Sequence, residues 1–74
     1  MFDEVKEIIS KYTEVDNITE DLSLTQDLKL TSLDVVSMVG EFEDAFDIEI
    51  ADEDVMQIKT VGDILEYLKK RGIE

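Results

Sequence analysis

Apolar residues recur three or four positions apart near both ends of the chain, which is the spacing of a helix with one buried face. This spacing predicts a helix over residues 3–12, with apolar members Val5, Ile8, Ile9 and Tyr12. It predicts another over residues 61–71, with apolar members Val61, Ile64, Leu65 and Leu68. Thr60 and Asp63 have the spacing of a capping box at its start, and Gly72 is suited to end it.

The segment between residues 13 and 30 is polar overall, yet it carries apolar residues at intervals. A loop of this length is unusual in a small domain unless its own side chains hold it. We therefore expect its apolar residues to pin the loop across the core: Val15, Ile18, Leu22, Leu24, Leu28 and Leu30.

The central helix, predicted over residues 32–46, has two apolar faces. Its first residues, Thr31-Ser32-Leu33-Asp34, have capping-box spacing, with Asp34 in the place of the preferred Glu. At about 100° per residue, one stripe has the width of a core face: Val35, Met38, Val39, Phe42 and Phe46. A second, smaller patch lies away from that stripe: Leu33, Val36 and Gly40. Polar residues surround it, with the last two further round: Ser37, Glu43, Asp44, Asp34 and Glu41.

The second patch has two interpretations. Leu33 and Val36 could contact the long loop or another helix, since single exposed apolar residues are common. An apolar patch with a carboxylate rim is also suited to docking a basic partner. The combination beside a helix N-terminus favours docking.

Residues 47–57 connect the two long helices. Asp47 to Ile50 alternate like a strand, but no second strand is available to pair with them, so we expect an extended loop. Residues 52–57 are predicted to form a short third helix. The whole chain, residues 1–74, is therefore predicted to be one all-α domain, a small four-helix bundle with a long first loop.

The composition excludes several kinds of chemistry. The chain has no cysteine and no histidine, which removes thiolate nucleophiles, zinc–cysteine sites and the commonest general base. Its 20 acidic and 7 basic residues give a net charge of -13, which disfavours nucleic acid and anionic membranes and attracts basic partners. Solubility alone is the alternative explanation of the charge. No run approaches the roughly 20 apolar residues of a membrane span, and the N-terminus lacks a signal-peptide pattern, so we expect a cytoplasmic protein.

Ser32 has two possible roles. Serine is a preferred N-cap, so spacing alone favours capping. Thr31 could cap the helix instead, which would leave the Ser32 hydroxyl available for modification. A helix N-terminus also suits a phosphate ester, because its free N–H groups and dipole favour negative charge.

The stretch "DLKLTSLDVVSMVGEFEDAFDIEIADEDVMQIKTVGDILEYL" resembles the acyl carrier proteins of fatty acid and polyketide synthesis. The resemblance is close over residues 22–68 and loose over the first helix. Thr31-Ser32-Leu33 matches the family's Asp-Ser-Leu motif, whose serine carries 4'-phosphopantetheine. The acidic helix, "FDIEI", "DED" and the closing "TV…YL" make the match specific.

The resemblance implies that Ser32 receives 4'-phosphopantetheine from coenzyme A and that the chain is a non-catalytic, monomeric carrier of acyl thioesters. Its implied partners are a phosphopantetheinyl transferase (holo-acyl-carrier-protein synthase) and the acyl-transferring and condensing enzymes of fatty acid, lipid or polyketide biosynthesis. The implied docking residues are Leu33, Asp34, Val36, Gly40, Glu41, Glu43 and Asp44. The implied acyl pocket is lined by Val39, Phe42, Phe46, Ile50, Ile58 and Leu65, although Phe42 and Phe46 are equally consistent with ordinary core packing.

Five positions depart from the family pattern. Thr31 replaces the acid before the serine, and Lys29 stands where glycine is common. Ser37, Gly40 and Ala51 replace residues that are commonly acidic, larger and apolar, and proline, respectively. These departures favour a specialised carrier over a housekeeping one.

Other functions fit less well. A hydrolase would need a base beside Ser32, and "DNITEDLSLTQD" lacks the ligand spacing and glycine of an EF-hand. No specific metal site is expected, although weak divalent binding could neutralise Glu41, Glu43, Asp44 and Asp47. A peptidyl or aminoacyl carrier, or an unmodified acidic interaction domain, remains an alternative. The acidic central helix favours the acyl class.

Overall fold

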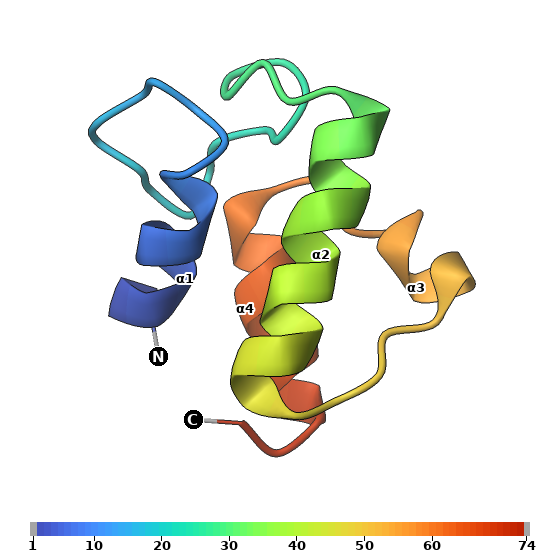
Figure 1. The fold of residues 1–74 in the computed structure, drawn as a ribbon. Coiled ribbons are helices and arrows are strands. Elements are labelled where there is room, and N and C mark those ends of the chain that lie inside the picture. Colours follow the sequence, from blue (N-terminus) through green and yellow to red (C-terminus); the bar gives the residue numbers. More distant parts are fainter. Residues whose placement is uncertain (1, 74) are drawn as a thin grey trace.

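The computed structural model describes residues 2–73 and contains four helices: α1 (Phe2–Ile9), α2 (Ser32–Phe46), α3 (Asp52–Val55) and α4 (Val61–Lys70) (Figure 1). The described residues contain no β-strand, only an isolated bridge between Ser23 and Thr60. The predicted all-α, four-helix architecture is confirmed. No helix in this part of the chain is long and apolar enough to cross a lipid bilayer.

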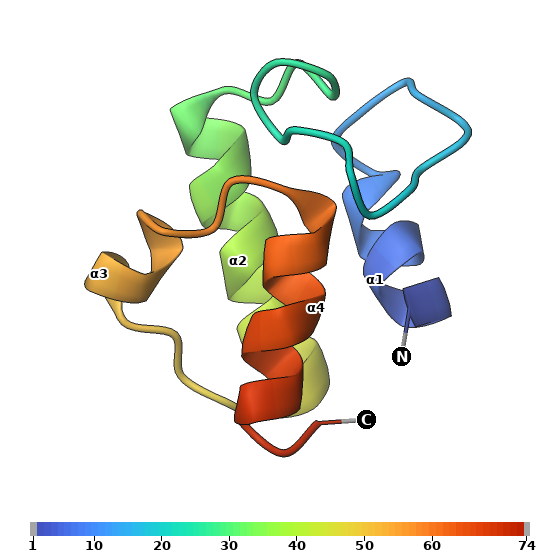
Figure 2. The ribbon, with the colours of Figure 1, turned by 180° about the vertical axis from the view of Figure 1, so that it is seen from behind.

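The helices surround one hydrophobic core. In Figure 1 α4 lies behind α2, and in the reverse view of Figure 2 it lies in front. Both views place α1 on one side of this pair and α3 on the other. The core takes side chains from α1, α2, α4 and the long loop, and its largest fully buried members are Phe42, Ile9, Leu24, Leu28, Met38, Leu68, Val5 and Val61. None of the buried residues comes from α3.

The long loop between α1 and α2 is held as the sequence predicted. Ile18, Leu24, Leu28 and Leu30 are buried, and Val15 and Leu22 are half-buried against the core. Backbone hydrogen bonds also join the loop to the start of α4: Leu24 N–H donates to Lys59 O, Val61 N–H to Leu22 O, and Gly62 N–H to Glu20 O.

Gly62 allows this close approach. A Cβ atom at this position would lie 3.2 Å from Glu20 O, so a larger residue would push the loop away from α4.

α1 is shorter than the predicted helix over residues 3–12. The Ser10 hydroxyl donates to Glu7 O at 2.7 Å, and the amides of Lys11 and Tyr12 bond to carbonyls only three residues back. A serine hydroxyl that occupies a helix carbonyl competes with the backbone, and i→i−3 bonds tighten the last turn. The periodic pattern therefore continues past Ile9, but the α-helix does not. Tyr12 is half-buried beside the core.

The remaining helix ends follow local chemistry. α4 ends at Lys70 rather than residue 71, because Gly72 has φ +85° and the amides of Gly72 and Ile73 bond to Lys69 O and Leu68 O. This is a Schellman ending, which needs a left-handed residue where glycine is least strained. α3 covers four residues rather than the predicted 52–57, since the amides of Gln57 and Ile58 form i→i−3 bonds. Residues 48–50 lie outside any helix or strand, as expected, but Asp47 is not extended: it is the left-handed C-cap of α2, with φ +54°.

The capping box at α4 generates a stability prediction. Thr60 Oγ1 accepts from Asp63 N–H at 3.1 Å, and Asp63 Oδ2 accepts from Lys59 and Thr60 N–H at 3.0 and 3.1 Å. These backbone hydrogen bonds, that of Lys59 first, lower the pKa of Asp63. Thr60→Ala should reduce the free energy of unfolding by about 1 kcal/mol, measured by urea titration.

Thr25→Ala is the matched control, because Thr25 is exposed and its hydroxyl makes no hydrogen bond within residues 2–73. Equal stabilities for the two variants would contradict the capping role.

Candidate functional site

Ser32 is the first residue of α2, and it is exposed. Within residues 2–73 its hydroxyl has no hydrogen-bond partner, so neither a cap nor a neighbouring side chain occupies it. An exposed alcohol at a helix N-terminus lies where the backbone favours an attached anion. The site therefore consists of an accessible nucleophile that the fold itself does not use.

Thr31 carries out the capping that could have occupied Ser32. Its backbone is extended (φ −84°, ψ 169°), and its Oγ1 accepts from Asp34 N–H at 3.1 Å. In return Asp34 Oδ2 accepts from Thr31 N–H at 3.0 Å. This reciprocal pair satisfies the first turn without Ser32. The predicted Thr31–Asp34 capping box is confirmed.

The most exposed large apolar residues of the described chain lie close to Ser32 along the chain or line the same groove. Leu33 and Val36 on α2 are 76% and 61% exposed, and Met56, just after α3, is 78% exposed. The expectation that Leu33 and Val36 point away from the core is thus confirmed. Gly40 lies further along α2 and is half-buried, and a Cβ atom there would meet no other atom within 4 Å. The small patch therefore has two projecting side chains followed by a gap.

A groove of about 500 Å³ opens directly beside Ser32. It lies between residues 23–26 of the long loop, the first turns of α2 and the segment 55–59. Its apolar lining consists of Leu24, Val35, Val36, Val55, Met56 and Ile58. Its polar lining, besides Ser32, consists of Ser23, Thr25, Gln26 and Lys59. An apolar groove with a few polar groups at a modifiable residue is suited to shielding an apolar group.

The six residues expected to line an acyl pocket are mostly elsewhere. Only Ile58 lines the groove. Val39, Phe42 and Leu65 are buried in the core, and Phe46 and Ile50 are half-buried against its edge. Phe42 and Phe46 stack with ring centroids 6.3 Å apart, which is an ordinary packing arrangement.

The sequence pattern did not predict a groove lined by Leu24, Val35, Val55 and Met56, and it predicted Val36 for docking alone. Met56 gave the one indication in the sequence. It is a large apolar residue in an acidic segment, with no apolar residue three or four positions away.

Glu41 lies on α2 but is tied to the end of α1. It accepts from Tyr12 Oη at 2.6 Å and from Lys11 Nζ at 3.1 Å. These contacts, that of Tyr12 first, lower the pKa of Glu41, and the same hydrogen bond to Glu41 is the main cause that raises the pKa of Tyr12. The Glu41 carboxylate therefore stabilises the α1–α2 packing. A partner that bound this carboxylate would compete with Tyr12 and Lys11 for it.

Of the other carboxylates expected at the docking face, two form internal hydrogen bonds and one does not. Glu43 Oε2 accepts from Ile50 N–H at 2.7 Å and so holds the α2–α3 connection near its end. Asp34 belongs to the capping box. Asp44 is exposed and has no hydrogen-bond or ion-pair partner within the described residues. Asp44 is therefore the carboxylate of this set most available to a partner.

Lys29 has an unusual backbone near the site. Its φ is +61°, a left-handed conformation that costs a non-glycine residue roughly 1 kcal/mol. The residue is exposed and brings a positive charge into the segment just before Ser32. The structure thus explains why glycine would suit this position, and the lysine is kept despite the strain.

Residues 2–73 contain no group of three or more carboxylates arranged to hold a metal ion. Of the four carboxylates considered for weak divalent binding, Glu41 and Glu43 have internal partners, and Asp47 forms the left-handed C-cap of α2.

Comparison with known proteins agrees with this geometry. Residues 3–68 match the family model described as "Phosphopantetheine attachment site". An acyl carrier protein of Thermotoga maritima is 42% identical over 73 residues, which cover 96% of this chain and 90% of that protein.

Two solved structures are similar in both fold and sequence. The Mycobacterium tuberculosis protein Rv0033, provisionally described as an acyl carrier protein, superimposes with a TM-score of 0.86 at 33% identity, covering 92% of this chain and 93% of that one. An acyl carrier protein from Enterococcus faecalis gives a TM-score of 0.79 at 36% identity, covering 90% and 87%.

The contact between Tyr12 and Glu41 predicts a pH-dependent stability. Because the pKa of Glu41 is lower in the folded chain than its ordinary 4.5, Glu41 contributes stability above that pH. The contribution is lost as the pH falls through the folded-state pKa. Tyr12→Phe should raise the pKa of Glu41, and should destabilise the protein more at neutral pH than at pH 3. NMR titration and urea unfolding across this range would measure both effects, and an unchanged pKa of Glu41 would contradict the account.

Proposed function

Because this chain belongs to the phosphopantetheine-attachment family as an acyl carrier protein, we propose that Ser32 is the residue to which its 4'-phosphopantetheine is attached. One observation carries this proposal: Thr31 caps α2, which leaves the exposed Ser32 hydroxyl without a structural task beside an apolar groove. When attached, the group supplies a terminal thiol that holds acyl groups as thioesters. It also supplies the thiol that a chain without cysteine lacks.

The residues around Ser32 fit such a group. The start of α2 offers its N–H dipoles to a phosphodiester, and the two capping hydrogen bonds join Thr31 to Asp34 without using the Ser32 hydroxyl. The groove beside Ser32 offers Val36, Val55 and Met56 to an apolar chain. We propose this groove as the entrance for acyl cargo. Of the other residues expected to line the pocket, Val39, Phe42 and Leu65 are buried in the core, and Phe46 and Ile50 pack against its edge.

The attachment reaction requires a partner enzyme. In the proposed step Ser32 Oγ bonds to the phosphorus that carries the pantetheine of coenzyme A. The pyrophosphate bond of coenzyme A breaks, and adenosine 3',5'-bisphosphate leaves. No side chain of the described residues hydrogen-bonds to the Ser32 hydroxyl, so the hydroxyl proton passes to a base on the transferase. The chain acts as a substrate and carrier rather than as a catalyst.

We propose that partners dock on the face of α2 around Leu33, Val36, Gly40 and Asp44. The two exposed apolar side chains supply contact area next to the serine. Asp44 and the net charge of -13 favour a partner with a basic face. Asp34, Glu41 and Glu43 add negative potential to this face while their hydrogen bonds hold the fold.

Two features of this face support a specialised carrier. Gly40 leaves a gap where a larger side chain would fit without a clash, and Lys29 places a cation in a strained loop before the serine. Both alter the surface that a transferase or synthase meets, and neither improves stability. Fatty acid, lipid and polyketide biosynthesis are the pathways to consider, and cytoplasmic location and monomeric state remain predictions.

The attachment site is tested by intact mass after incubation with coenzyme A and a broad-specificity phosphopantetheinyl transferase. Wild-type protein should gain one phosphopantetheinyl group, and Ser32→Ala should gain none. Because Thr31 caps α2, Ser32→Ala should keep the helical circular dichroism of the wild type. Ser37→Ala, a second exposed serine on α2, is the control and should be loaded. A loaded Ser32→Ala protein would overturn the assignment.

Docking by charge is tested with Asp44→Lys. Because this carboxylate is exposed and makes no hydrogen bond within residues 2–73, its reversal should slow loading by roughly threefold at low salt without unfolding the chain. The difference should shrink toward 0.5 M salt, where the screening length is only about 4 Å. Asp16→Lys, on the long loop, makes the same change in net charge and is the control. Equal slowing by both variants, or an effect that salt leaves unchanged, would contradict steering through this face.

A further inference from the structure

α3 is the weakly held wall of the groove beside Ser32. It has four residues, none of them buried, and no side-chain cap at its N-terminus. Val55, Met56 and Ile58 nevertheless form one side of the groove, and Met56 is 78% exposed. Short helices with few buried contacts belong to the part of a protein that opens most readily. Anything that holds α3 in place therefore also sets the width of the groove.

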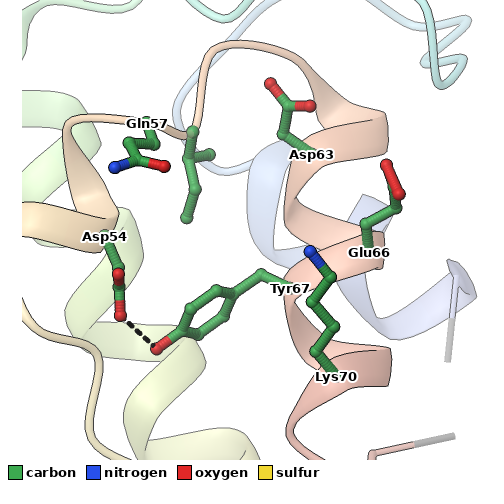
Figure 3. A pocket seen from close by; sticks show the side chains of 7 residues that line it. Asp54, Gln57, Asp63, Glu66, Tyr67 and Lys70 are labelled. Carbon is green, nitrogen blue, oxygen red and sulfur yellow. Dashed lines mark hydrogen bonds between the residues drawn. The ribbon is translucent and has the colours of Figure 1, made fainter.

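Polar contacts from Tyr67 on α4 and from Arg71, the residue just after α4, hold α3 on the side opposite the groove. Tyr67 Oη donates to Asp54 Oδ2 at 2.9 Å, as the dashed line in Figure 3 shows. Arg71 Nη1 donates to Tyr67 Oη at 2.9 Å and to Glu49 O at 2.6 Å. We call these four residues, Glu49, Asp54, Tyr67 and Arg71, the α3 clasp. They fasten α4 both to α3 and to the connection that precedes it.

The surroundings of the clasp give it more weight than a single surface contact. A cavity of about 180 Å³ lies between α3 and α4 beside the Tyr67–Asp54 hydrogen bond, and most of its lining is polar or charged. Figure 3 shows the Tyr67 ring reaching from α4 across this space to Asp54. Ile58 is the one aliphatic side chain in the lining of this cavity, and the half-buried hydroxyl of Tyr67 makes the direct link between α3 and α4.

We propose that Tyr67 and Arg71 are positioning residues that control how well the groove shields an acyl chain, by restraining α3 against α4. The proposal rests on the proposed function, in which the acyl chain is carried from Ser32. Loss of the clasp leaves the core formed by α1, α2, α4 and the loop in place, because α3 contributes no buried side chain to it. The wall of the groove moves while the bundle stays folded.

The first test uses the unloaded protein. Tyr67→Phe keeps the ring and removes only the hydroxyl, and Tyr12→Phe does the same to the other half-buried tyrosine, whose partner is Glu41. Amide hydrogen exchange at Val55 and Met56, which bond within α3, should be about fivefold faster in Tyr67→Phe and unchanged in Tyr12→Phe. Arg71→Met, a change at an exposed residue, should accelerate the same amides.

The second test uses protein loaded with acetyl or octanoyl phosphopantetheine. In mild alkali, the octanoyl thioester on Tyr67→Phe should be hydrolysed about fivefold faster than the same thioester on the wild type. The acetyl thioester should be hydrolysed at the same rate on both proteins, since only the longer chain fills the groove. A purely structural role would lower overall stability without this dependence on chain length.

The two tests separate the two proposals. Unchanged exchange at Val55 and Met56 in both Tyr67→Phe and Arg71→Met would overturn the clasp. Fast exchange with unchanged octanoyl hydrolysis would overturn its link to cargo. A wild-type chain that cannot be loaded at Ser32 would instead overturn the proposed function. The exchange result would still test the clasp, because it is measured on unloaded protein.

Discussion

The reciprocal hydrogen bonds between Thr31 and Asp34 are the constraint on which the site depends. A helix must satisfy its first N–H groups, and a serine at its start ordinarily takes part in this task. Here the threonine one position earlier completes the cap with Asp34, and α2 begins with a hydroxyl that the fold does not need. The proposed chemistry uses this surplus group. Helix geometry then places Val36 one turn beyond the serine, and both Val36 and Leu33 are exposed.

The second constraint is the small size of the domain. The interior is filled by side chains such as Phe42, Met38 and Leu24, all at most 1% exposed, so the open apolar space lies at the surface between α2 and α3. One wall of this space is formed by α3 and the residues that follow it, and α3 buries no side chain. The carboxylates are divided between two tasks. Glu41 and Glu43 hold neighbouring segments, while Asp44 remains available to a partner.

Much of this organisation could be predicted from the sequence, because it depends on local patterns. Helical spacing located α2 and α4 closely, and the two Thr–Asp capping boxes are present as expected. The predicted end of α1 was wrong, because the Ser10 hydroxyl competes for a helix carbonyl and the spacing of apolar residues does not reveal this competition. The groove was not predicted, since it joins Leu24, Val36 and Met56 from three separate segments. The internal bonds of Glu41 and Glu43 were missed for the same reason: each partner lies at least seven residues away in the sequence.

The central claim is that the unused hydroxyl of Ser32 carries the phosphopantetheine in the living cell. It is tested most directly by peptide mapping and tandem mass spectrometry of the protein isolated from the cell that makes it. The account predicts a phosphopantetheinyl ester on the peptide that contains Ser32, with fragment ions that place it on this residue and not on Ser37. A protein that is wholly unmodified in its native cell, or one that carries the group on another residue, would contradict it.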